Sequence, residues 1–207
     1  MHYAMKLAML GTALVLVAGC GGSSVLMSPR MDLQAFHRIG LVEFTSNAEG
    51  DLNALASQEF IQKLQSAQPG VPVLELGNEE SVRQAIGRQT LDPAAVQEIG
   101  KVYNVDAVII GNLEVADVKP SVGLSQLTSA SVQADIEAAL TTKLLEAGGG
   151  ATMWTRSARA KKTVANAGIN SQGVHFEASD PEAAYGSLVH HLVHDVTEDF
   201  RPYWVKQ

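Results

Sequence analysis

Short apolar runs alternate with helical repeats along the first half of this chain, and this alternation limits the folds that it can adopt. Residues 38–45 form a compact apolar run of the length of a buried strand. Asp51 then stands where a helix N-cap is expected, and apolar side chains recur every four residues up to about residue 67. Pro69-Gly70 ends that helix, and residues 71–76 predict a second strand.

The same alternation continues to residue 115. Asn78 is the expected N-cap of a short helix, and Asp92-Pro93 indicates the start of another, because a capping side chain followed by proline suits a first helical turn. The second of these helices is expected over residues 94–103. Its predicted inward-facing positions are Val96, Ile99 and Val102. Residues 105–115 predict a strand at the middle of the sheet.

The second half of the chain predicts a hairpin between two polar loops. From residue 132 apolar and polar side chains alternate as in a half-buried strand, although Ile136, Leu140 and Leu144 also fit a helix. Gly148-Gly149-Gly150 favours the strand, since a glycine turn followed by renewed alternation is typical of a hairpin. The remaining expectations are a strand over 152–164, loops over 117–131 and 165–179, and a closing helix over 182–200.

The order of these elements predicts an α/β fold. We expect a layered α/β sandwich, with a mixed sheet that ends in a C-terminal β-hairpin and is covered by the closing helix. The chain has 207 residues, enough for one domain with a substantial core. Its formal net charge is −7. Because an acidic surface repels a phosphate backbone, nucleic acid is not an expected partner.

The amino terminus reads as an export signal. Lys6 is followed by apolar and small residues up to Gly19, fewer than the roughly 20 that span a bilayer but enough for a signal peptide. Val17-Ala18-Gly19-Cys20 ends this run, and Cys20 is the only cysteine in the chain. The segment resembles the lipobox of bacterial lipoproteins. An ordinary signal peptide that happens to hold a cysteine is the alternative.

This resemblance implies cleavage between Gly19 and Cys20 and attachment of diacylglycerol and an N-acyl chain, such as palmitate, to Cys20. Several buried acyl chains anchor a protein durably in a membrane, and no other cofactor is expected. Gly21 follows the cysteine where an inner-membrane signal would place aspartate, which favours the outer membrane with the domain facing the periplasm. The expected division is a lipoprotein signal peptide over 1–19, the lipidated cysteine and a flexible tether over 20–35, and a periplasmic α/β domain over 36–207.

The body of the chain resembles the CsgG-like and TolB amino-terminal class of periplasmic domains, which includes LpoB-type lipoproteins. The most specific segment is Asp106-Ala107-Val108-Ile109-Ile110-Gly111 behind a helix. The other segments are residues 38–44, residues 91–95 leading into residues 98–111, residues 142–146 before the glycine turn and Trp154, and the closing helix. The resemblance implies a non-enzymatic protein of cell-envelope assembly, secretion or regulation. It departs from a CsgG-like pore, which needs longer insertions than the two polar loops supply.

His190 and His194 are weak candidates for a metal site. They are four residues apart in the closing helix, so both imidazoles could reach one ion. His175 and Asp195 are the available third ligands, and His191 stands where a zinc protease would need its glutamate. A solvated or partner-facing helix edge is the other interpretation, and we expect no metal.

Aromatic and basic residues are the candidates for partner contact. The aromatic candidates are Trp154, Tyr203 and Trp204, although Trp154 also fits a core position. The basic candidates on the hairpin are Arg156, Arg159, Lys161 and Lys162. They suit acidic partners or lipid headgroups, but the protection of an exposed strand edge is the favoured interpretation.

We therefore expect a non-enzymatic lipoprotein that acts by contact with an envelope protein or with copies of itself, as an assembly, secretion or regulatory accessory. No motif of nucleophilic catalysis supports an enzyme. A CsgG-like oligomeric secretion channel component and a metal-binding protein that uses His190 and His194 are the alternatives.

Overall fold

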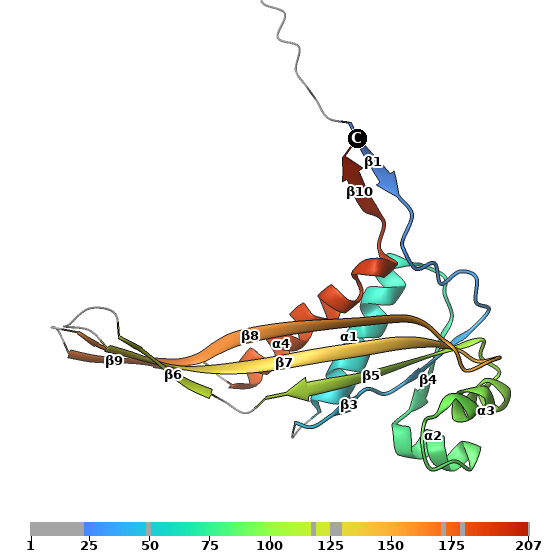
Figure 1. Ribbon diagram of the computed structural model, residues 1–207, viewed down its shortest axis with the longest axis horizontal. Helices are drawn as coiled ribbons and strands as arrows, with labels where there is room; N and C mark the ends of the chain where they lie inside the picture. The colour runs from blue at the N-terminus through green and yellow to red at the C-terminus, as the bar shows by residue number, and fades with distance from the viewer. Residues whose placement is uncertain are drawn as a thin grey trace, which may run out of the picture.

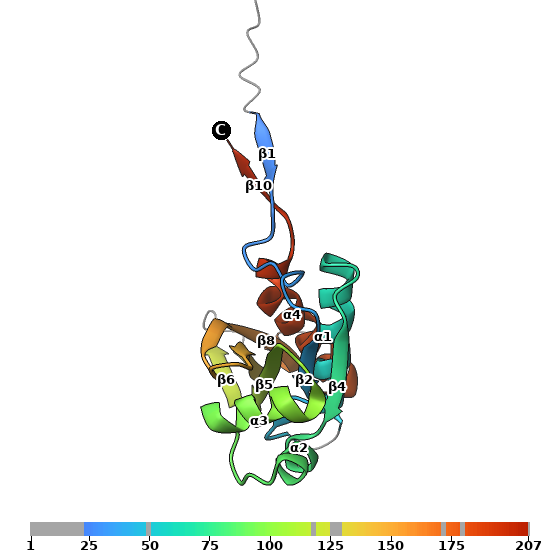
Figure 2. The same ribbon diagram turned by 90° about the vertical axis from the view of Figure 1, so that its right-hand side faces the viewer.

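The computed structural model describes residues 23–48, 51–116, 119–124, 130–170, 173–178 and 181–206. It is an α/β protein with a mixed sheet and a long antiparallel hairpin, as predicted. Helices α1 (Leu52–Ala67) and α4 (Pro181–Val196) lie on one face of the sheet (Figure 1). Helices α2 (Glu79–Ile86) and α3 (Pro93–Tyr103) lie at one end of the other face (Figure 2). Within the described ranges, no helix combines the length and apolarity needed to cross a membrane.

The sheet has the strand order β4-β2-β5-β7-β8-β9. Strands β4 (Val73–Gly77), β2 (Ile39–Val42) and β5 (Ala107–Val115) are parallel. Strands β7 (Ala130–Glu146), β8 (Thr152–Asn170) and β9 (Gly173–Ala178) continue the sheet antiparallel. The short strand β3 (Thr45–Ser46) also pairs with β5, and β6 (Lys119–Leu124) pairs with β7. The central place predicted for the strand over 105–115 is confirmed, because β5 lies between β2 and β7.

Two hydrophobic layers hold the helices on the sheet. The larger layer lies under α1 and α4, where Phe60 stacks edge-on against Phe44 and Phe200 with ring centroids 5.3 and 6.1 Å apart. The smaller layer joins α2 and α3 to the other face through residues such as Val96 and Val108. The closing helix buries the predicted stripe Ala184, Leu188, Leu192 and Val196.

Two of the three predicted helix caps are confirmed. The Asn78 side chain accepts a hydrogen bond from the Ser81 amide at 2.9 Å, and Asp92 accepts one from the Ala95 amide at 2.8 Å. Asp51 occupies the predicted N-cap position of α1, but its side chain makes no capping hydrogen bond. Val102 was wrongly predicted to face inward: it is 54% exposed, because the sheet meets α3 on the side that carries Val96.

The two predicted polar loops contain strands, which corrects the sequence-based prediction. Strand β6 lies within 117–131, and 165–179 holds both the end of β8 and β9. Serine, glycine and proline are common there, but pairing with the long hairpin supplies every strand with backbone partners and overrides local preference. The hairpin is therefore longer than expected, and its far end is a four-stranded antiparallel sheet (Figure 1).

The closing helix is shorter than predicted. It ends at Val196, and a 3-10 turn, η1 (Glu198–Phe200), follows. At this end, the Thr197 hydroxyl donates a 2.7 Å hydrogen bond to the Val193 carbonyl. The chain then leaves the body as β10 (Tyr203–Lys206).

Part of the predicted tether packs on the body. Strand β1 (Ser24–Met27) pairs antiparallel with β10, and Leu33 is fully buried. The Gln68 side chain at the end of α1 accepts a 2.7 Å hydrogen bond from the Leu33 amide and donates to the carbonyls of Met31 and Phe200 at 2.6 and 3.1 Å. The domain boundary at residue 36 stays a prediction, and Gly19 and Cys20 lie outside the described residues.

Candidate functional site

One face of the long hairpin is not covered by a helix over much of its length. Side chains alternate along β7 and β8, so that one set packs toward α1 and α4 and the other set points away. The outward set includes Glu137, Arg159 and Lys161, all exposed. Figure 1 shows α2 and α3 at one end of the hairpin only. A polar strip of β5, β7 and β8 is therefore open to solvent beyond them. We call this strip the open face.

The open face is hollow at its centre because small residues lie there. Ala139 of β7 pairs with both Glu114 of β5 and Arg159 of β8, so one acidic and one basic side chain flank a methyl group. The concave region measures about 770 Å³. It is lined by Asn47, Asn112, Glu114, Val115, Ala116, Glu137, Ala138, Ala139, Arg159, Ala160 and Lys161. A hollow rimmed by charges of both signs suits a polar partner surface.

Within this strip, Lys161 and Arg159 differ in how they are engaged. The Lys161 ammonium lies 2.9 Å from Asp135 and 4.0 Å from Glu137. Hydrogen bonds from Lys161 and from the Thr163 hydroxyl lower the pKa of the Asp135 carboxyl. Arg159 makes no hydrogen bond or ion pair with any described residue. Its planar guanidinium is therefore available for a carboxylate of a partner.

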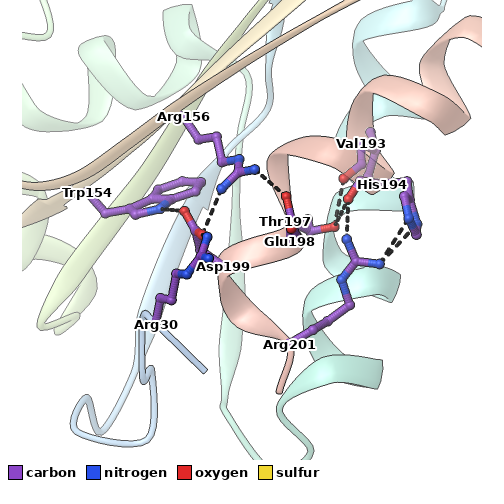
Figure 3. Close-up of polar contacts among 9 residues, drawn as sticks. All are labelled: Arg30, Trp154, Arg156, Val193, His194, Thr197, Glu198, Asp199 and Arg201. Atoms are coloured by element: carbon purple, nitrogen blue, oxygen red, sulfur yellow. Dashed lines mark hydrogen bonds and ion pairs between the residues drawn. The ribbon is translucent and has the colours of Figure 1, made fainter. Parts of the chain in front are cut away.

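A second polar cluster surrounds Asp199 at the base of β10 (Figure 3). The Asp199 carboxylate accepts a hydrogen bond from the Trp154 indole at 3.1 Å and lies 2.7 Å from Arg156 and 3.3 Å from Arg30. Arg156 also pairs with Glu198. Burial raises the pKa of Asp199, but hydrogen bonds from Arg156, Trp154 and Arg30 together lower it below its usual value. The cluster joins η1, β8 and the segment that follows β1.

The structure separates the three aromatic candidates. Trp154 is half-buried against Phe200, with ring centroids 4.7 Å apart, so it packs in the core as well as binding Asp199. Tyr203 is half-buried, and the Arg30 guanidinium lies 4.8 Å from its ring centroid. Trp204 is 67% exposed. Partner binding by these residues stays a prediction. Of the three, Trp204 is exposed enough to contact a partner.

The histidine helix does not gather a ligand set. His190 Nδ1 lies 3.4 Å from a Glu59 carboxylate oxygen, whereas His194 contacts Arg201. Burial and the Arg201 charge lower the pKa of His194. In the described part of the chain, no group of three or more His, Cys, Asp or Glu side chains could hold a metal ion. Metal binding by His190 and His194 stays an untested alternative.

Two features of the structure could not be predicted from the sequence. The Asp199 cluster joins residues 30, 154 and 199, and no local pattern relates positions so far apart. The pairing of β1 with β10 joins the two ends of the described chain. The sequence gives one indication of this pairing: apolar residues 25–27 and the aromatic pair Tyr203-Trp204 each form a short, strand-like run.

Comparisons with known proteins show similarity of architecture at low sequence identity. No family model matches the chain, and no curated protein matches it. Among solved structures, the PelC dodecamer from Paraburkholderia phytofirmans matches with a TM-score of 0.45 and 13% identity, over 87% of this chain and 97% of that one. Lipoprotein GNA1162 from Neisseria meningitidis matches with a TM-score of 0.42 and 17% identity, over 77% of this chain and 97% of that one.

The LpoB C-terminal domain from Escherichia coli also matches, with a TM-score of 0.35 and 11% identity, over 60% of this chain and 82% of that one. The structural neighbours thus include the LpoB C-terminal domain and lipoprotein GNA1162. The CsgG-like and TolB-like parts of the resemblance stay a prediction. Likenesses at these scores and identities carry no information about what this chain binds.

Proposed function

We propose that this chain is a non-enzymatic cell-envelope lipoprotein. It is exported, cleaved before Cys20 and held by lipid on Cys20 at the periplasmic side of the outer membrane. The support is the sequence Val17-Ala18-Gly19-Cys20, which places the only cysteine directly after an apolar run. Anchored in this way, the α/β body works in assembly, secretion or regulation by touching an envelope protein or another copy of itself.

The observation that supports action by contact is the open face with the free Arg159. Sheets that leave a face unpacked expose a flat and rigid array of side chains whose positions are fixed by strand register. Here that array combines a free guanidinium, the nearby Glu114 and the hollow above Ala139. A partner that brings a carboxylate to Arg159 would gain a charge-assisted pair in a partly enclosed setting.

Site-specific photo-crosslinking in living cells tests this proposal. A photoreactive residue replaces Ala139 at the centre of the open face, in the tagged full-length protein. The matched control replaces Ala85, an exposed alanine of α2. We expect a discrete adduct from position 139 and none from position 85. An adduct equal in mass to two chains would identify the partner as a second copy.

A charge reversal then links the adduct to Arg159. We expect Arg159→Glu to abolish the adduct at position 139. Arg88→Glu is the matched control, since Arg88 is exposed after α2 and its side chain makes no hydrogen bond or ion pair with described residues. If both variants retain the adduct, Arg159 does not hold the partner. If position 139 gives no adduct in the parent protein, the open face is not the contact surface.

A further inference from the structure

The two ends of the described chain form a small apolar ribbon outside the body. Among the described strands, β1 and β10 pair only with each other, and Figures 1 and 2 show them projecting beyond the helices. We call this pair of strands the terminal ribbon. Among the described residues, eight large apolar side chains are exposed, and five of them belong to this ribbon. These five are Val25, Leu26, Met27, Trp204 and Val205.

The ribbon is apolar on both faces. Directly paired residues of an antiparallel ladder share a face. The pairs Val25–Val205 and Met27–Tyr203 therefore lie on one face, and Leu26–Trp204 lies on the other. A two-stranded ribbon is at best marginally stable in water. The five exposed side chains are not stabilised by burial in the core of the body. An environment that covers both faces would stabilise the ribbon.

We propose that the terminal ribbon lies in the headgroup layer of the bilayer and forms a second, non-covalent membrane contact beside the lipid on Cys20. A folded protein partner would cover one face of the ribbon, whereas lipid surrounds both. Tryptophan and tyrosine are the side chains enriched at this depth, and both occur in β10. Lys206 at the tip adds a cation that anionic headgroups attract.

The depth follows from backbone chemistry. Both outer edges of the ribbon carry unpaired amides and carbonyls, which are costly to place in hydrocarbon but are hydrated among headgroups. Each strand has four residues, about 13 Å in length, against about 30 Å for the hydrocarbon core. The ribbon therefore reaches into the interface and does not cross the bilayer.

The covalent structure of the chain places the ribbon at the bilayer, and this step rests on the proposed lipidation. Only Gly21, Gly22 and Ser23 separate Cys20 from β1. From Cys20 to Ser24 the chain advances by four residues, and a fully extended chain covers no more than about 14 Å over that distance. A lipidated Cys20 thus holds Ser24 within the depth of the headgroup region and raises the local concentration of the ribbon there.

Depth-dependent quenching of Trp204 fluorescence tests the inference. The full-length lipidated protein carries Trp154→Phe, which leaves Trp204 as its only tryptophan and keeps an aromatic ring against Phe200. It is reconstituted into phosphatidylethanolamine–phosphatidylglycerol vesicles that contain brominated lipid. We expect a blue shift and a large loss of Trp204 emission with bromines near the headgroups, and a smaller loss with bromines near the chain ends. Unchanged emission with both lipids overturns the inference.

A matched pair of variants separates the ribbon from general membrane proximity. Leu26→Lys, opposite Trp204, is expected to reduce the quenching strongly. Val102→Lys is the control, because Val102 is 54% exposed, compared with 52% for Leu26, but lies on α3 at the far side of the body. Equal quenching in all three proteins contradicts a specific role of the ribbon.

Two further outcomes keep the inference distinct from the proposed function. Mass spectrometry of the same preparation shows whether Cys20 carries lipid. Lipidated protein with unquenched Trp204 would refute the ribbon contact and leave the lipoprotein proposal standing, whereas protein without lipid would refute the lipoprotein proposal. If light scattering shows oligomers that Leu26→Lys dissolves, while Trp204 stays unquenched, a second copy covers the ribbon and the membrane contact is wrong.

Discussion

At the scale of single residues, the charge of Asp199 has a calculable effect on stability. Its pKa is lowered in the folded protein, so the charged form stabilises the fold above the pKa of the unfolded chain, and this contribution is lost as the pH falls through the folded pKa. We expect Asp199→Asn to reduce the free energy of unfolding at neutral pH by about 1.5–3 kcal/mol, the range for hydrogen bonds to charged groups. The difference from the parent protein should shrink below about pH 4.

Urea denaturation at several pH values measures this difference. Glu198→Gln is the control, because Glu198 pairs with the same Arg156 but its side chain is 56% exposed. An exposed ion pair contributes about 0–1 kcal/mol, so this variant should differ little from the parent. A difference for Asp199→Asn that stays constant down to acidic pH would show that its charge is not the stabilising feature.

Gly111 is the residue of β5 that permits close packing of an aromatic ring. A Cβ atom at this position would lie 2.6–2.7 Å from three ring atoms of Phe44, and Phe44 is held in the core by Phe60. We expect Gly111→Ala to lower the free energy of unfolding by about 1–3 kcal/mol, as overpacking in a core does. Gly186→Ala is the contrasting variant, since nothing lies within 4 Å and alanine favours a helix, so equal or higher stability is expected. Destabilisation of both variants to the same degree would contradict this explanation.

At the scale of elements, Gln68 joins the segment after β1 to α1 and η1. Its buried amide makes three hydrogen bonds with the backbone of that segment and of Phe200. Gln68→Ala leaves these groups without partners, which should cost about 1–3 kcal/mol. Hydrogen exchange at the Leu33 amide should become faster than exchange in β5. Gln62→Ala, an exposed glutamine of the same helix, is the control, and unchanged exchange at Leu33 would refute the link.

Most of the helices and the parallel strands could be predicted from sequence because each depends on a local pattern. Asn78 and Asp92 mark helix starts. The buried positions of β5 are all apolar, as expected for a strand with helices on both faces of the sheet. Strands β6 and β9 could not be predicted, since they depend on pairing with β7 and β8 and not on their own composition. The sequence predicted only that the hairpin carries basic residues. Which of them is paired depends on the register between β7 and β8, which places Lys161 beside Asp135 and leaves Arg159 without an ion pair among the described residues.

At the scale of the whole molecule, the ribbon and the hairpin have different directions. Figure 1 shows the terminal ribbon pointing upward, away from the body, whereas the β7–β8 hairpin runs from side to side. If the ribbon and Cys20 meet the bilayer together, the hairpin extends along the membrane surface. The open face, on the opposite side of the sheet from α1 and α4, then stays accessible to other envelope proteins. A single flexible tether would leave the orientation of the hairpin unrestricted. The two proposed contacts with lipid together fix this orientation, and so determine which face of the sheet a partner can reach.

The last prediction concerns attachment of the whole chain to its membrane. In a bacterium that processes lipoproteins, we expect the parent protein to incorporate labelled palmitate, to begin at Cys20 and to sediment with membranes. Cys20→Ala should lose the label and most of the sedimenting protein, because a short interfacial ribbon alone supports only weak and reversible binding. Ser24→Ala, four residues further on, should retain both. Label that persists in Cys20→Ala would place the lipid on another residue and would also remove the short link that brings the ribbon to the bilayer.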